Sequence, residues 1–227
     1  MLKNLNKMVV MLAFTSLIVS CKDDPTDPQP FEAKVSVVQV LNDVEKVDFH
    51  VGDEKVNTAG IAKGVFDKYY IVLAGNQKIT VFEEGQTDTL VSVQENLAPT
   101  STNTLFVYGN EEDAKWLSVR DNMTEPQTDK AKVRVVNTLE NEANAHLFIE
   151  GLEDAWIENA EPKKVQNFVS LSPVADKKLS VTLGDSEIVV AEIETLKVEA
   201  GKIYSIILFE EIEGETTSIK AKLIEQK

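Results

Sequence analysis

Residues 131–138 read Ala-Lys-Val-Arg-Val-Val-Asn-Thr, and residues 33–40 read Ala-Lys-Val-Ser-Val-Val-Gln-Val. Five of the eight positions are identical, and the stretches lie 131 − 33 = 98 residues apart. Both have the length and the valine content of one β-strand. A repeat of this period indicates a duplicated domain, because solenoid repeats span about 20–50 residues. Each copy of the stretch is therefore expected to open one β-rich unit.

The similarity between the two halves continues beyond these stretches. Residues 47–51 lie over residues 145–149 at the same spacing, 145 − 47 = 98. Residues 78–81 lie over residues 178–181 at a spacing of 178 − 78 = 100, which a small difference in loop length explains. The predicted division is a first domain, a polar linker with Pro126 and a second domain, at residues 32–121, 122–129 and 130–227.

Each half offers about seven short segments rich in Val, Ile, Phe and Tyr, which is what an immunoglobulin-like sandwich requires. We therefore predict an all-β protein with two tandem immunoglobulin-like antiparallel β-sandwich domains. Val35 and Val37 are expected to face one side of their strand, and Ser36, Val38 and Val40 the other. The polar segment 153–166 is interpreted as a loop with at most a short helix. Further strands are expected at residues 69–74, 78–82, 89–94, 104–108, 115–119, 167–172, 178–183, 187–194, 203–209 and 217–224.

The N-terminus predicts an exported lipoprotein. Two lysines precede an uncharged apolar run that ends at Ser20, and this run is shorter than the roughly 20 residues of a membrane span. Residues 1–20 are therefore interpreted as a signal peptide, cleaved between Ser20 and Cys21. Residues 18–21, Ile-Val-Ser-Cys, resemble the bacterial lipobox, which implies acyl chains on Cys21. The alternative is an ordinary secretory signal with a chance cysteine, but a lone thiol has no disulfide partner.

The residues after Cys21 predict where the protein is displayed. Lys22-Asp23-Asp24 resembles the export signal of Bacteroidota surface lipoproteins, which implies the outer face of the outer membrane. The alternative is that these residues are only part of a solvated tether. Residues 21–31 carry three prolines and several polar residues, so they are expected to form an extended tether in either case. The expected partner is thus the membrane, bound through the lipid anchor.

Composition restricts the other partners. The full chain has a net charge of −15, and removal of residues 1–20 with their two lysines leaves 21 − 38 = −17. Nucleic acid is not an expected partner, because phosphate contacts need a basic patch. No catalytic motif, phosphate loop or metal-binding loop is present in the sequence. We predict no catalytic residue, metal or cofactor, and we interpret His50 and His146 as surface residues of strands.

Three further residues are candidates for specific roles. Trp156 lies in a polar segment and is the best candidate for a ligand contact. Trp116 lies in an expected strand and is predicted to be a core residue. Asp88-Thr89-Leu90 resembles a three-residue O-glycosylation site of Bacteroidota, which makes Thr89 a candidate for modification.

The repeated pattern resembles a family of tandem sandwiches in exported bacterial proteins, the domain of unknown function 4397. Members open with a strand similar to residues 131–137, followed by a strand similar to residues 47–51. Ala74-Gly75 and Ala200-Gly201-Lys202-Ile203-Tyr204 fit later elements, whereas Gln39 stands where Asn is usual. The resemblance implies a fold and an extracytoplasmic setting. It brings no catalytic residues.

These patterns support three hypotheses of function. The leading one is a non-enzymatic cell-envelope lipoprotein, a surface-displayed binding or spacer module for an unidentified protein or glycan. The second is a glycan-binding accessory protein of a polysaccharide-uptake system, which needs an exposed aromatic platform. The third is a hydrolase with dispersed acids, which needs a cleft with converging carboxylates.

Overall fold

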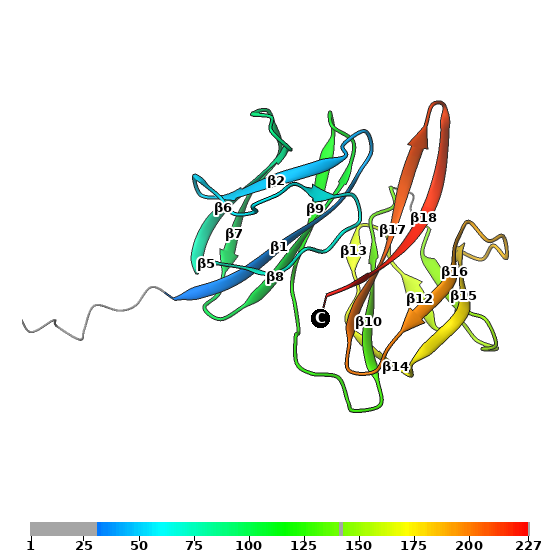
Figure 1. The fold of residues 1–227 in the computed structure, drawn as a ribbon. Coiled ribbons are helices and arrows are strands. Elements are labelled where there is room, and N and C mark those ends of the chain that lie inside the picture. Colours follow the sequence, from blue (N-terminus) through cyan, green and yellow to red (C-terminus); the bar gives the residue numbers. More distant parts are fainter. Residues whose placement is uncertain (1–30, 141–142, 227) are drawn as a thin grey trace, which may run out of the picture.

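The computed structural model describes residues 31–140 and 143–226, and all regular structure in these ranges is β-strand. The strands form two sandwiches that lie side by side (Figure 1). The predicted all-β sandwich fold is therefore confirmed. The signal peptide, Cys21 and the tether up to residue 30 lie outside the described residues. Within the described ranges, no helix has the length and hydropathy to cross a membrane.

The N-terminal unit consists of two sheets. One has the strand order β5-β1-β8-β9, and the other has the order β3-β2-β6-β7 with β4 also beside β2. The strands are β1 (Glu32–Leu41), β2 (Lys46–Val51), β3 (Glu54–Lys55), β4 (Ile61–Ala62), β5 (Tyr70–Leu73), β6 (Gly75–Glu83), β7 (Thr89–Leu97), β8 (Thr102–Gly109) and β9 (Ala114–Arg120).

The C-terminal unit repeats this arrangement. One sheet has the order β13-β10-β17-β18 with β14 also beside β10, and the other has the order β12-β11-β15-β16. The strands are β10 (Ala131–Asn137), β11 (Ala145–Ile149), β12 (Ile157–Ala160), β13 (Lys164–Val165), β14 (Val169–Leu171), β15 (Val174–Leu183), β16 (Ala191–Val198), β17 (Ile203–Glu213) and β18 (Thr216–Glu225).

The direction of pairing departs from the prediction at one place in each unit. β1 runs parallel to β8, and β10 runs parallel to β17, whereas the other pairings are antiparallel. Parallel neighbours need a long connection. Here β2–β7 and β11–β16 lie within these connections, so the alternation of short segments alone does not reveal the parallel pairs.

The segment 153–166 is not the loop that we expected, because it contains β12 and β13. Ala160 of β12 is fully buried in the core, and its carbonyl accepts a 2.8 Å hydrogen bond from the Asn137 side chain. Tertiary contacts therefore hold this polar segment in the sheet, against the local sequence pattern.

Each unit has its own apolar core between its two sheets. In the N-terminal unit, Val35, Val37 and Phe49 point into this core. In the C-terminal unit, Val133 and Leu147 do the same. The expected orientation of Val35 and Val37 is thus confirmed.

A third apolar cluster joins the two units. It lies between the sheet that contains β1 and the sheet that contains β10. Each of these sheets has one face on the core of its own unit, and the third cluster buries the opposite face. The four sheets are therefore stacked, and the two inner sheets are covered on both faces. The fully or largely buried members of the cluster are Val38, Val40, Phe106, Tyr108, Val136, Ile207, Phe209 and Ile224.

The shared cluster predicts the effect of truncating β17. Ile207 is fully buried between the units, so Ile207→Ala should lower the free energy of unfolding by about 2–5 kcal/mol. Ile212 lies on the same strand but is 41% exposed, and Ile212→Ala should cost less than about 1 kcal/mol. Urea denaturation of both variants measures the difference. Equal losses would contradict an interface that stabilises the fold.

Candidate functional site

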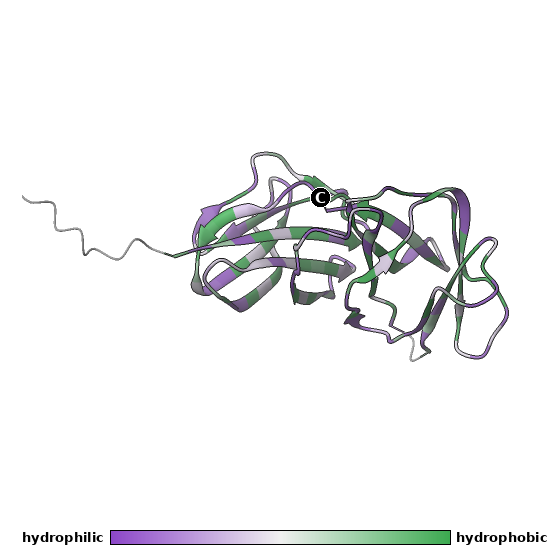
Figure 2. Ribbon diagram, turned by 90° about the horizontal axis from the view of Figure 1, so that it is seen from below, coloured by the Kyte–Doolittle hydropathy of each residue, from purple (hydrophilic) through white to green (hydrophobic). Residues whose placement is uncertain are grey.

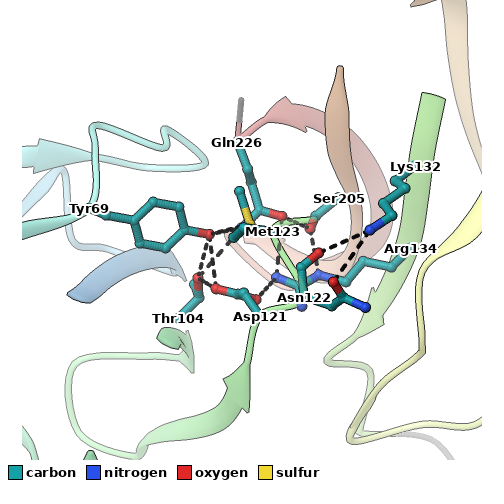
Figure 3. A network of polar contacts seen from close by, with 9 residues as sticks. All are labelled: Tyr69, Thr104, Asp121, Asn122, Met123, Lys132, Arg134, Ser205 and Gln226. Atoms are coloured by element: carbon teal, nitrogen blue, oxygen red, sulfur yellow. Dashed lines mark hydrogen bonds and ion pairs between the residues drawn. The ribbon is translucent and has the colours of Figure 1, made fainter. Parts of the chain in front are cut away.

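A buried cluster of polar side chains lies where the two units meet, and it is the most highly connected polar site of the described chain (Figure 3). We call it the inter-unit cluster. Its members are Tyr69, Thr104, Asp121, Arg134, Ser205 and Gln226.

Arg134 is the central residue of the inter-unit cluster. It belongs to β10 and is 1% exposed, and its Nη2 lies 2.7 Å from Oδ1 of Asp121 in the N-terminal unit. This contact is an ion pair without the alignment of a hydrogen bond to that oxygen. The guanidinium also donates to Ser205 Oγ at 2.8 Å and to Gln226 Oε1 at 3.2 Å.

Aromatic rings enclose the guanidinium. Its central carbon lies 4.5 Å from the ring centroid of Phe168 and 5.4 Å from that of Phe106. Arg tolerates such surroundings because its planar cation stacks on ring faces and is weakly hydrated. The rings therefore exclude water from the ion pair while they compensate part of the lost hydration.

Asp121 receives its remaining contacts from the N-terminal unit. Its Oδ2 accepts hydrogen bonds from Thr104 at 2.6 Å and from the Tyr69 hydroxyl at 2.9 Å. Burial and the nearby Asp121 carboxylate raise the pKa of Tyr69 well above its ordinary value. Tyr69 thus remains a hydrogen-bond donor at all physiological pH values.

The cluster is built from equivalent positions of the two repeats. The backbone N–H of Asp121 donates to Thr102 O at 2.7 Å, and that of Gln226 donates to Ile203 O at the same distance. Thr102 and Ile203 in turn pair with Lys34 and Lys132, which are 98 residues apart. The same correspondence relates Ser36 to Arg134, Tyr69 to Phe168, Thr104 to Ser205 and Asp121 to Gln226.

The predicted linker lies along one side of this cluster. Lys132 Nζ contacts the backbone oxygen of Thr124 at 2.7 Å and that of Asn122 at 3.4 Å. Together with the Arg134–Asp121 pair, these contacts hold the first residues of the linker against β10. Five of the six members of the inter-unit cluster are buried, Tyr69 is partly exposed and the two charges are paired, so the arrangement serves to position the units.

The two tryptophans lie apart from the inter-unit cluster. Trp156 is half-buried against the C-terminal core, and its backbone N–H donates to Leu147 O at 2.8 Å. Its role as a contact residue stays a prediction. The prediction that Trp116 is a core residue is wrong, because its side chain is 43% exposed. Trp116 lies on β9, the last strand of its sheet.

The other candidate residues lie on strand surfaces. Thr89 is exposed at the start of β7, and its modification stays a prediction. His50 contacts the Phe82 ring with 4.9 Å between centroids, and His146 is half-buried on β11. Among the described residues, no group of three or more His, Cys, Asp and Glu side chains is placed to hold a metal ion.

Sequence reasoning missed Arg134 and Asp121. The available signal was the repeat itself, because Arg134 replaces Ser36 inside an otherwise apolar strand. A charge at such a position needs a partner of opposite sign. Asp121 lies at the end of the first domain, and the sequence does not identify it as the partner of Arg134 because that pairing depends on how the two units pack.

The family assignment rests on sequence. The profile of the domain of unknown function (DUF4397) matches residues 33–148, which is more than half of the chain. The chain belongs to this family. Its opening motif has a structural role, because Gln39 and Asn137 are both fully buried and accept hydrogen bonds from the backbone two residues later. No curated protein sequence matches the chain.

Solved structures show only distant similarity. CBMbc (family CBM26) from Eubacterium rectale Amy13K, in complex with maltoheptaose, has 10% identity and a TM-score of 0.22, with 83% of this chain and 95% of that chain covered. A candidate cell adhesion protein from Bacteroides uniformis has 10% identity and a TM-score of 0.24, with 88% and 98% covered. A candidate adhesin from Bacteroides ovatus has 10% identity and a TM-score of 0.20, with the same coverage. At these TM-scores, no property transfers to the chain.

The inter-unit cluster predicts how single and double substitutions differ. Arg134→Met leaves the Asp121 carboxylate buried without a cation, which should cost about 3–5 kcal/mol of unfolding free energy. Asp121→Asn combined with Arg134→Met removes both charges and should recover most of that loss. Urea denaturation measures both variants.

The matched control for these variants is Lys164→Met. It breaks an ion pair with Glu161 in which both side chains are more than half exposed, and it should cost less than about 1 kcal/mol. If the double variant is as unstable as Arg134→Met, the pairing of the two charges does not determine stability here.

Proposed function

We propose that this chain is a non-enzymatic lipoprotein of the cell envelope that displays a rigid binding module at the outer surface of the outer membrane. The sequence around Cys21 supports the anchor and its surface display, and the buried interface between the two units is the observation that supports a rigid module. This interface joins the units into one stacked body of four sheets. A lipid chain on Cys21 would connect this body to the membrane through the tether of residues 22–30.

The position of the first strand fits this role. β1 begins at the end of the molecule that lies away from the C-terminal unit (Figure 2). A tether that enters there would hold the N-terminal unit near the membrane and extend the C-terminal unit outward. Two or more acyl chains anchor a protein stably, because each buried methylene contributes about 0.8 kcal/mol.

Glu140 lines a hollow between the two units, and its surroundings do not favour the hydrolase hypothesis. Glu140 lies 3.0 Å from Lys115 and 3.0 Å from Lys163. Burial alone would raise the pKa of Glu140, but the hydrogen bonds from both lysines outweigh this effect and hold its pKa below the ordinary value. A general acid needs a raised pKa, so Glu140 is poorly suited to donate a proton.

A glycan-binding role is the second candidate. It is favoured by a solvent-open hollow on the outer sheet of the C-terminal unit, lined by Phe148 and several polar side chains. Such a mixture of an aromatic ring and hydrogen-bonding groups is typical of small-molecule sites.

Protease treatment of whole cells tests the proposal. Trypsin cleaves after lysine, and Lys22 lies beside the anchor, so treatment of intact cells should release a large fragment that lacks Cys21. The Cys21→Ala variant should instead be a folded, soluble protein of the periplasm that trypsin reaches only after lysis. Complete protection of the wild-type chain in intact cells would contradict surface display. A Cys21→Ala variant that stays membrane-bound would contradict lipid anchoring.

A further inference from the structure

The outer face of β11 and β15 forms a hollow of about 530 Å³ in the C-terminal unit. Four side chains of the two strands form its floor: His146, Phe148, Ser180 and Thr182. The loop of residues 184–189 forms one wall and includes the exposed Val189. We call this feature the Phe148 hollow.

The equivalent face of the N-terminal unit is filled by side chains. His146 pairs with Thr182 across the strands of the hollow, as Asp48 pairs with Phe82 in the first repeat. In the first repeat, the centroid of the Phe82 ring lies 4.9 Å from that of the His50 ring, so two rings occupy this face. Thr182 stands in place of the Phe82 ring in the second repeat. The replacement of a phenyl group by a small hydroxyl side chain therefore opens the hollow.

The polar groups of the two faces also differ. In the N-terminal unit, Asp48 binds Lys55 at 2.8 Å and accepts a hydrogen bond from Asn57 at 2.9 Å. In the C-terminal unit, Thr182 is 7% exposed and lines the hollow, yet its hydroxyl has no hydrogen-bond partner among residues 31–140 and 143–226. The His146 and Ser180 side chains likewise have none within those ranges. These side chains are therefore available to form hydrogen bonds with a ligand in the hollow, whereas the Asp48 carboxylate of the first repeat is already paired.

The lining selects the class of ligand. Phe148 and Val189 supply apolar surface, and His146, Ser180 and Thr182 supply short hydrogen-bonding groups beside it. A sugar ring combines an apolar face of C–H groups with hydroxyls at its edge, so it matches both parts. The rim residues Asp185 and Glu187 and the net charge of the chain repel anions, which favours an uncharged sugar.

We infer that the Phe148 hollow binds a neutral pyranose ring of a glycan. The ring face would pack on Phe148, and its hydroxyls would bond to Thr182, Ser180 and His146. This inference names a class of ligand for the proposed binding module. Its biological setting rests on the proposed function. The outer sheet of the C-terminal unit lies on the side away from the start of β1 (Figure 1), where an anchored protein would meet an external glycan.

Ligand-observed NMR of the mature chain tests this inference. The chain is purified in a detergent without sugar headgroups, and the probes are the methyl pyranosides of glucose, galactose, mannose and N-acetylglucosamine. At least one probe should show saturation transfer that a titration fits to one site. Thr182→Phe copies the filled face of the N-terminal unit, so it should abolish the signal without unfolding the sheet. Phe148→Ala should weaken binding by about tenfold or more.

His50→Ala is the matched control, because His50 occupies the position in the N-terminal unit that Phe148 occupies in the C-terminal unit. It should leave binding unchanged. The absence of transfer for all four probes, or a signal that Thr182→Phe does not reduce, would overturn the inference. Both results concern the purified protein, so they are independent of whether protease treatment of cells supports surface display.

Discussion

The packing of one inner sheet against the other is the constraint on which the rest of the structure depends. β1, β8, β10 and β17 carry apolar side chains on both faces, so each unit alone would expose an apolar sheet face to water. The packing of these two faces against each other removes that exposure. It also fixes where the only buried cation of the described interface, Arg134, meets Asp121. A sandwich pair joined in this way is one body rather than two domains on a flexible linker.

The interface has the character of a homodimer contact inside one chain. Equivalent residues of the two repeats meet in the inter-unit cluster, as in an isologous contact. A fully symmetric version would place a second arginine where Ser36 lies. The divergence of the repeats keeps a single ion pair and leaves the Ser36 hydroxyl buried without a hydrogen bond within the described residues. The difference between the repeats that specifies the packing therefore has a local cost in free energy, which arises from this buried Ser36 hydroxyl.

The longer strands, their faces and the duplication could be predicted from alternation and from the repeat, whereas the short strands β12 and β13 lie in a segment predicted as a loop. Three other features could not be predicted. Pairing of β1 with β8 depends on the whole unit between them. Burial of Val38 on the face away from its core depends on a partner sheet from the other unit. The Phe148 hollow depends on the absence of a ring at Thr182, which matters only once the registers of both repeats are compared. A continuous apolar run, such as residues 105–108, is the feature of the sequence that indicates a strand buried on both faces.

Residual dipolar couplings of the backbone amides test the central claim most directly. If the inner sheets pack as described, a single alignment tensor fits the amides of residues 32–120 and of residues 131–140 and 143–225. Two tensors that differ in magnitude or orientation would mean that the units move relative to each other. Such a result would contradict the rigid four-sheet body from which the proposed presentation of the C-terminal unit follows.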